Sequence, residues 1–122
     1  GFEELLSSGY SFVSYPLRVV IRLYPRGEKD FPARIAVSVS KRRFKRAVKR
    51  NRVKRLIRET YRLNKNILYS YIPEDKTMDI LFIYLHDEIF EYGKIEKAIT
   101  GAIKKIRSYI EKDGSGDIAD TH

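Results

Sequence analysis

Hydrophobic and polar residues alternate along two stretches of the chain, and a third stretch is almost entirely apolar. From Leu17 to Tyr24 and from Arg34 to Ser40, every second residue is apolar, which is the period of a strand with one buried face. The two strands are close enough in sequence to form an antiparallel pair, with a turn region between them. Met78 to Leu85 is nearly all apolar, which is typical of a strand covered on both faces.

Three other stretches have the repeat of a helix. Phe2 to Ser8 can form a short helix that ends at Gly9. In the middle of the chain, a buried face at intervals of three and four residues is predicted for Val53, Leu56, Ile57, Thr60, Tyr61 and Asn64. A last helix is predicted from Lys94 to Lys112, with a buried stripe of Ile95, Ala98, Ile99, Ala102, Ile103, Ile106 and Ile110.

These elements predict one α+β domain, because 122 residues suffice for a single modest core. We expect a two-layer α/β sandwich over residues 1–112, with the order α-β-β-β-α-β-α. The remaining residues, 113–122, are polar and contain two glycines, so we expect a flexible tail. Gly101 lies inside the last predicted helix, where glycine costs about 1 kcal/mol relative to Ala. We therefore expect Gly101 to pack closely against a neighbouring element.

The net charge of +9 comes from one segment of the chain. Lys41 to Lys65 contains 13 Lys or Arg residues and a single acid, Glu59, and so carries a net charge of +12. The remainder holds 12 basic and 15 acidic residues, for a net charge of −3. A segment with so few compensating acids repels itself unless an anionic partner is bound. The charge pattern therefore indicates an anionic partner.

The positive charges have a definite place on the central predicted helix. Projected at about 100° per residue, the side opposite the apolar stripe carries Asn51, Arg55, Arg58 and Arg62, with Arg52 beside them. Glu59 lies one turn from both Arg55 and Arg62, and we expect its carboxylate to help fix those guanidinium groups.

The composition excludes several kinds of site and indicates where in the cell the protein is located. The chain has no Cys, which excludes disulfides and thiolate zinc sites. Its longest apolar run, Ile80 to Leu85, is far shorter than the roughly 20 residues of a membrane helix. No stretch has the pattern of a signal peptide. We therefore expect a cytoplasmic protein without a membrane partner.

The string KRNRVKRLIRE, from Lys49 to Glu59, resembles the RNR signature of the bacterial ribonuclease P protein family. The preceding residues match the family as well. Ile35 to Ser40 (IAVSVS) resembles its strand before the signature, and Lys41 to Arg46 (KRRFKR) resembles its basic loop. Gly9 and the apolar strand at Ile80 to Ile83 also fit. The resemblance covers roughly residues 2 to 110 and is most specific from Ile35 to Arg62.

The resemblance implies a protein subunit of ribonuclease P, which assists a catalytic RNA in removing the 5′ leader of precursor tRNA. The active site and the bound Mg²⁺ are expected mainly in the RNA subunit, with no catalytic or metal-binding residue in the protein and a 1:1 complex. A cleft between the first helix and the sheet would receive the leader. The family fold also implies a left-handed βαβ crossover, against the general preference. RNA-subunit contacts are expected at Arg50, Asn51, Arg52, Lys54, Arg55, Arg58 and Arg62, and leader contacts at Phe2, Lys41, Arg42 and Arg46.

Physical chemistry agrees with that division of roles. Arginine bonds phosphate through two parallel donors, and an unstacked base needs an aromatic face beside positive charge. Phe2 fits this second role, with Tyr10, Tyr15 and Tyr24 as weaker candidates. The chain departs from the family where Leu6 replaces a second aromatic. It also departs where Leu85, His86 and Asp87 replace a basic residue, and where Arg43, Phe44 and Lys45 replace a small residue and Gly.

Two other classes of function are compatible with parts of the pattern. A ribosomal or other structural RNA-binding protein could also carry a basic helix on an α/β sandwich. A protein-only nuclease would need clustered carboxylates to hold magnesium. The candidates for such a cluster are Asp79, Asp87, Glu88 and Glu91, but the last three are expected at the beginning of the final helix, where the helix dipole favours acids.

Overall fold

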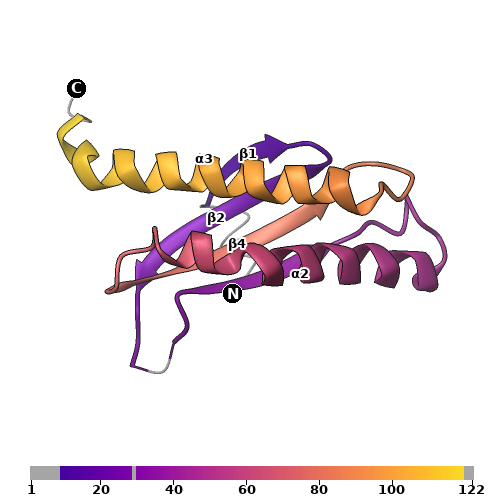
Figure 1. The fold of residues 1–122 in the computed structure, drawn as a ribbon, viewed down its shortest axis with the longest axis horizontal. Coiled ribbons are helices and arrows are strands. Elements are labelled where there is room, and N and C mark those ends of the chain that lie inside the picture. Colours follow the sequence, from indigo (N-terminus) through magenta and orange to yellow (C-terminus); the bar gives the residue numbers. More distant parts are fainter. Residues whose placement is uncertain (1–8, 29, 120–122) are drawn as a thin grey trace.

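The computed structural model describes residues 9–28 and 30–119 as two helices on a four-stranded sheet. In Figure 1, both helices lie on the same face of the sheet and run along its strands. The helix predicted at Phe2 to Ser8 lies outside the described residues. The strands are β1 (Tyr10–Ser14), β2 (Leu17–Pro25), β3 (Ala33–Ser38) and β4 (Lys76–Tyr84), and the helices are α2 (Ala47–Tyr69) and α3 (Tyr92–Ala119).

The sheet has the strand order β1-β2-β4-β3, which contradicts the predicted antiparallel pair of the two alternating strands. β4 lies between them, antiparallel to β2 and parallel to β3. Hydrophobicity explains this placement, because a nearly all-apolar strand is most stable in the interior of the sheet, where neighbouring strands shield both of its edges and the helices cover one face. β1, whose residues the sequence pattern did not locate, forms the other edge as a hairpin with β2.

The parallel strands β3 and β4 are joined by α2, which crosses over one face of the sheet. Viewed from the helix side with these two strands pointing upward, β4 lies to the left of β3 (Figure 1). The crossover is therefore left-handed, as the family resemblance implied and against the general preference. Because α2 follows β3 after a short connection, it begins beside the end of β3, and the basic loop lies at the same end of the domain as the beginning of the basic helix.

The core lies between the sheet and the two helices. Val53, Ile57 and Tyr61 of α2 are buried, which confirms the direction of the predicted stripe. Leu56 and Asn64, also predicted to be buried, are only half-buried. The two polar residues of the predicted α2 stripe form hydrogen bonds within the helix: Thr60 Oγ1 donates to the Leu56 carbonyl at 2.7 Å, and Asn64 Nδ2 donates to the Thr60 carbonyl at 2.8 Å.

All predicted positions of the α3 stripe are buried except Ile110, which is half-buried.

Gly101 of α3 lies against β1, as its position inside a helix predicted. A Cβ atom on Gly101 would lie 3.0 Å from Ser14 Oγ. That hydroxyl is held in place because it donates to the Ala98 carbonyl at 2.7 Å. The helix itself continues to Ala119, beyond the predicted end at Lys112. The flexibility of the predicted tail stays a prediction.

Candidate nucleic-acid interface

The outward side of α2 forms a shallow groove of cationic side chains. The groove has a volume of about 480 Å³ and is lined by Asn51, Lys54, Arg55, Arg58, Glu59 and Arg62. Five of the seven residues predicted to contact an RNA subunit are therefore brought together on one face. Four of the lining residues are cations and one is an acid, so the groove suits a polyanion.

Glu59 orders part of this groove. Its carboxylate oxygen Oε1 lies 2.7 Å from Nη2 of Arg62, which confirms one of the two predicted pairs. Among the described residues, Glu59 forms no ion pair with Arg55, so the second predicted pair is wrong. The exposed pair contributes little to stability, but it restricts the Arg62 guanidinium to one side of the groove. Arg55 and Arg58 stay exposed to solvent.

Arg52 and Arg50, the other two predicted RNA contacts, differ in orientation. Arg52 is exposed beside the groove. Arg50 is half-buried, and its Nη1 atom donates to the carbonyls of Phe44 and Lys45 at 2.8 and 3.0 Å. Arg50 therefore fixes the preceding loop to the helix. Its contact with RNA stays a prediction.

The beginning of α2 is unusually poor in negative charge. Arg46 is the N-terminal flanking residue, it makes no side-chain cap, and the first turn contains no acid. Helix beginnings usually carry acids, because the exposed backbone N–H groups there are equivalent to partial positive charge. Here the dipole adds to the charges of Arg46, Lys49 and Arg50. An external anion such as phosphate would therefore stabilise this end of the helix.

The basic loop of residues 41–46 is anchored by its one aromatic residue. Phe44 is buried, and its ring centre lies 6.0 Å from that of Tyr84 at the end of β4. The Arg42 backbone N–H donates to Ser40 Oγ at 2.9 Å. These contacts explain how Phe44 replaces the small residue and Gly expected at this point. The predicted leader contacts Lys41, Arg42 and Arg46 are all exposed, whereas Phe2 lies outside the described residues.

A second hollow opens where β3 and β4 end. Its volume is about 660 Å³, and it is lined by Ser40, Arg42, Arg43, Ile83, Tyr84, Leu85 and Asp87. Of the predicted leader contacts, it contains Arg42. Arg43 Nη1 lies 2.9 Å from Asp87 Oδ1, and this pair joins the loop to the β4–α3 connection. The sequence pattern missed the pair, because nothing in the spacing of these residues indicates it.

Acidic residues do not form a metal site in the described part of the chain, where no group of three or more Asp, Glu or His side chains could hold an ion. Asp79 is bonded by Arg34, and Asp87 by Arg43. The prediction that Asp87 and Glu88 lie at the beginning of the last helix is wrong, because α3 begins at Tyr92. Glu91 does lie there, since it immediately precedes Tyr92 and its carbonyl accepts hydrogen bonds from the N–H groups of Lys94 and Ile95. No helix among the described residues is long and apolar enough to cross a membrane.

Comparison with known proteins identifies similar chains. A family model described as Ribonuclease P matches residues 1–107. A curated relative from Porphyromonas gingivalis, named ribonuclease P protein component, is 43% identical over 105 residues, which cover 85% of this chain and 76% of the relative. A second relative of the same name, from Chlorobaculum tepidum, is 43% identical over 70 residues, or 57% of this chain and 43% of the relative.

Solved structures show the same fold at lower identity. The RNase P protein of Thermotoga maritima matches with a TM-score of 0.65 and 24% identity, covering 85% of this chain and 89% of that one. The RNase P protein of Staphylococcus aureus matches with a TM-score of 0.64 and 24% identity, covering 86% and 87%. At this identity the likeness concerns the fold alone.

Proposed function

As a member of the ribonuclease P protein family, the chain is a protein subunit of ribonuclease P, the enzyme that processes tRNA, and we propose that the groove on α2 binds the RNA subunit. The observation that carries this proposal is the groove itself, where Lys54, Arg55, Arg58 and Arg62 line one surface with a single acid. A rigid helix holds these cations at fixed spacings, which suits the fixed phosphate positions of a structured RNA.

The other two predicted contacts, Arg50 and Arg52, extend this surface toward the beginning of α2. Asn51, which already lines the groove, and Arg52 beside it lie one turn before Arg55. We assign both to the RNA subunit, and we assign Arg50 a double role in which it also holds the basic loop. Each phosphate bound at this end gains from the charges and from the helix dipole together.

We propose that the 5′ leader of precursor tRNA binds the second group of predicted contacts, which are Phe2, Lys41, Arg42 and Arg46. Support comes from the loop of residues 41–46, where the buried Phe44 ring fixes a chain of exposed cations. A single-stranded leader follows such a charged track through its phosphates and needs an aromatic face for an unstacked base. Phe2 is the residue that we propose for that face.

We propose that the RNA subunit carries out catalysis and would hold the Mg²⁺ ions. Support comes from two of the four candidate acids for a protein site, Asp79 and Asp87, because both are engaged by arginines. The protein would then contribute binding and orientation of the substrate. We further propose one protein per RNA subunit and a cytoplasmic location.

Competition between RNAs tests the proposal against a ribosomal or other structural RNA-binding role. The chain is titrated into labelled ribonuclease P RNA at physiological salt, with unlabelled ribosomal RNA fragments of matched length as competitors. Charge alone does not discriminate between RNAs, so we expect a preference of at least about 100-fold only if the surface fits its own partner. Equal competition by the ribosomal fragments would contradict the assignment.

A further inference from the structure

Three aromatic rings gather at the end of the sheet where the hairpin of β1 and β2 turns. Tyr15 lies in that turn, and His86 and Phe90 belong to the connection between β4 and α3. The His86 and Phe90 rings are stacked, with their centres 4.2 Å apart and their planes 10° from parallel. The Tyr15 ring meets both of them edge to face, with its centre 6.1 and 6.2 Å from theirs. We call these three residues the aromatic cluster.

Hydrogen bonds fix the two segments that carry the aromatic cluster to one another. The Tyr15 hydroxyl lies 2.9 Å from His86 Nδ1, within hydrogen-bonding distance. The Leu85 backbone N–H donates to the Pro16 carbonyl at 2.8 Å, which ties the end of β4 to the hairpin turn. The orientation of the Tyr15 ring is therefore set both by its hydroxyl and by the backbone beside it.

A buried tyrosine holds the connection between β4 and α3 in shape. The Tyr84 hydroxyl donates to the Glu88 carbonyl at 2.7 Å and accepts from the Phe90 backbone N–H at 3.1 Å. The Tyr84 side chain is itself fixed, because it is fully buried in the main core. The aromatic cluster is thus ordered before any ligand binds, which lowers the entropy lost on binding.

The aromatic cluster lies on the helix side of the sheet, at the end of the domain that carries the basic loop. Phe90 packs against the main core, which lies between the sheet and the helices. Because β3 and β4 are parallel and end level with one another, the segments that follow them leave the same edge of the sheet. The pair of Arg43 with Asp87 joins these segments. His86, which immediately precedes Asp87, therefore lies beside the basic loop.

Solvent reaches the aromatic cluster, and a cation lies next to it. Tyr15 is 54% exposed, and His86 and Phe90 are half-buried. Lys94 of α3 is exposed, with its Nζ atom 5.2 Å from the centre of the Phe90 ring. Packing alone would favour rings that are fully buried, because each exposed ring forgoes hydrophobic stabilisation. An exposed ring beside a cation suits an unpaired nucleotide, whose base stacks on the ring while the cation attracts a phosphate.

We propose that the aromatic cluster binds an unpaired nucleotide of the RNA subunit, with the base stacked on the exposed part of the Tyr15 ring and a neighbouring phosphate bound by Lys94. This inference rests on the proposed function, in which the groove on α2 binds that RNA. The sequence indicated Tyr15 as a weaker candidate for a base of the leader. Its surroundings favour the RNA subunit, because the aromatic cluster and the groove both lie on the helix side. A structured RNA also presents its unpaired bases at fixed positions, which suits rings that are held in place.

Two substitutions of Tyr15 test the proposal through the affinity of the chain for the isolated RNA subunit. Tyr15→Leu keeps an apolar side chain but has no ring, whereas Tyr15→Phe keeps the ring and loses only the hydroxyl. We expect Tyr15→Leu to weaken binding about tenfold, because a stacked base contributes a factor of that size. Tyr15→Phe should change the affinity by less than about twofold. The salt dependence should be the same for both variants and the unmodified chain, because no phosphate contact is lost.

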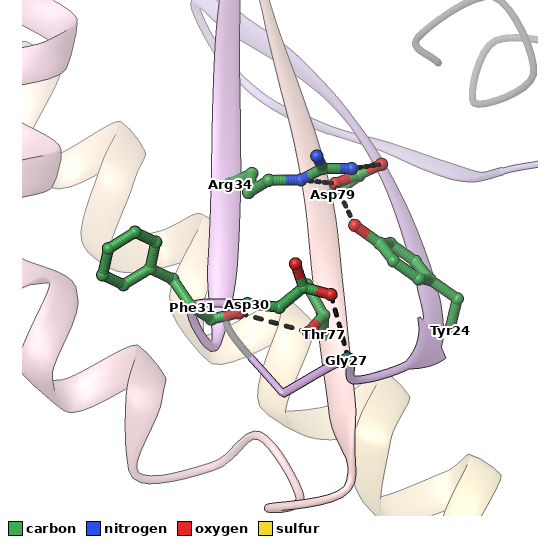
Figure 2. A network of polar contacts seen from close by, with 7 residues as sticks. All are labelled: Tyr24, Gly27, Asp30, Phe31, Arg34, Thr77 and Asp79. Atoms are coloured by element: carbon green, nitrogen blue, oxygen red, sulfur yellow. Dashed lines mark hydrogen bonds and ion pairs between the residues drawn. The ribbon is translucent and has the colours of Figure 1, made fainter.

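The matched control is Phe31→Leu, which removes another exposed ring. Phe31 is 70% exposed and precedes β3, at the opposite end of the sheet from the aromatic cluster. Figure 2 shows its ring pointing away from the polar side chains of the sheet, while its carbonyl accepts from Thr77 Oγ1 at 3.2 Å. We expect this variant to bind the RNA subunit like the unmodified chain.

Lys94→Gln tests the phosphate contact separately, and it remains available if Tyr15→Leu does not fold. Lys94 is exposed on α3, so the substitution should leave the fold intact. We expect about threefold weaker binding of the RNA subunit, as for an exposed charge pair. The salt slope should become shallower by about 0.7, because one phosphate is no longer neutralised. Unchanged affinity and slope would contradict the role of Lys94.

Equal losses for the two Tyr15 variants, or no loss for either, would show that the aromatic cluster only packs the hairpin against the connection and would overturn the inference. So would a loss confined to the binding of precursor tRNA by the assembled enzyme, because the base would then belong to the substrate. Failure of the proposed function gives a different result, in which the unmodified chain itself does not bind the RNA subunit. The unmodified chain therefore separates failure of the function from failure of the aromatic cluster.

Discussion

Replacing Arg55, Arg58 and Arg62 together by Ala is expected to weaken binding to the RNA subunit about 1000-fold, because each lost charge-assisted contact costs roughly tenfold. All three line the groove on α2. The logarithm of the affinity should also fall less steeply with salt, by about 2 to 3 units of slope, since three phosphates are no longer neutralised. The fold should persist, because the three side chains are exposed.

A control with the same change in net charge separates the groove from general attraction. Lys97, Lys104 and Arg107 are exposed cations of α3, and their joint replacement by Ala removes three charges on another surface. Electrostatic attraction alone would make the two triple variants equivalent. Equal losses would therefore mean that the RNA subunit does not bind in the groove of α2.

Ile57→Ala is expected to lower the free energy of unfolding by about 2 to 5 kcal/mol, the range for a large aliphatic residue removed from a packed core. Ile57 has no exposed surface and lies in the main core cluster between the sheet and the helices. Urea unfolding followed by circular dichroism measures the change. Leu56 is half-buried, so its replacement by Ala should cost less than that of Ile57.

Leu63→Ala is the matched control on the same helix. Leu63 is 58% exposed, and substitutions at such positions usually change stability by less than about 0.5 kcal/mol. A large loss for Leu63→Ala together with a small loss for Ile57→Ala would mean that α2 faces the sheet with its other side. The cationic groove would then lie in the wrong place as well.

Periodicity predicted the faces of the elements well and the neighbours of the strands poorly. The stripe containing Ile57 and the one containing Ile99 follow from spacing alone, because burial repeats with the period of the helix. Strand order does not follow from spacing, since alternation in Leu17 to Tyr24 indicates a buried face and not the identity of the adjacent strand. β1 (Tyr10–Ser14) was not predicted, because an edge strand with mostly exposed side chains has only a weak alternation of apolar and polar residues.

The candidate site was predictable where it depends on one helix and unpredictable where it depends on contacts between distant segments. The groove follows from projecting α2, whereas the inward bonds of Arg50 and the pair of Arg43 with Asp87 depend on how the loop folds. The pairing of Asp79 with Arg34, by contrast, could have been predicted from the sequence. A lone acid within an apolar strand must find a donor, and the cations of the neighbouring strands were available.

Cleavage of precursor tRNA at low magnesium concentration tests most directly the claim that the chain acts by binding, within a ribonuclease P whose active site is RNA. Three reactions are compared: the chain alone, the RNA subunit alone, and the two together. Cations of the protein can replace part of the magnesium that screens phosphates, so we expect rapid removal of the 5′ leader only when both are present. Leader removal by the RNA-free chain, persisting through repurification, would contradict the account, as would a combined reaction no faster than that of the RNA alone.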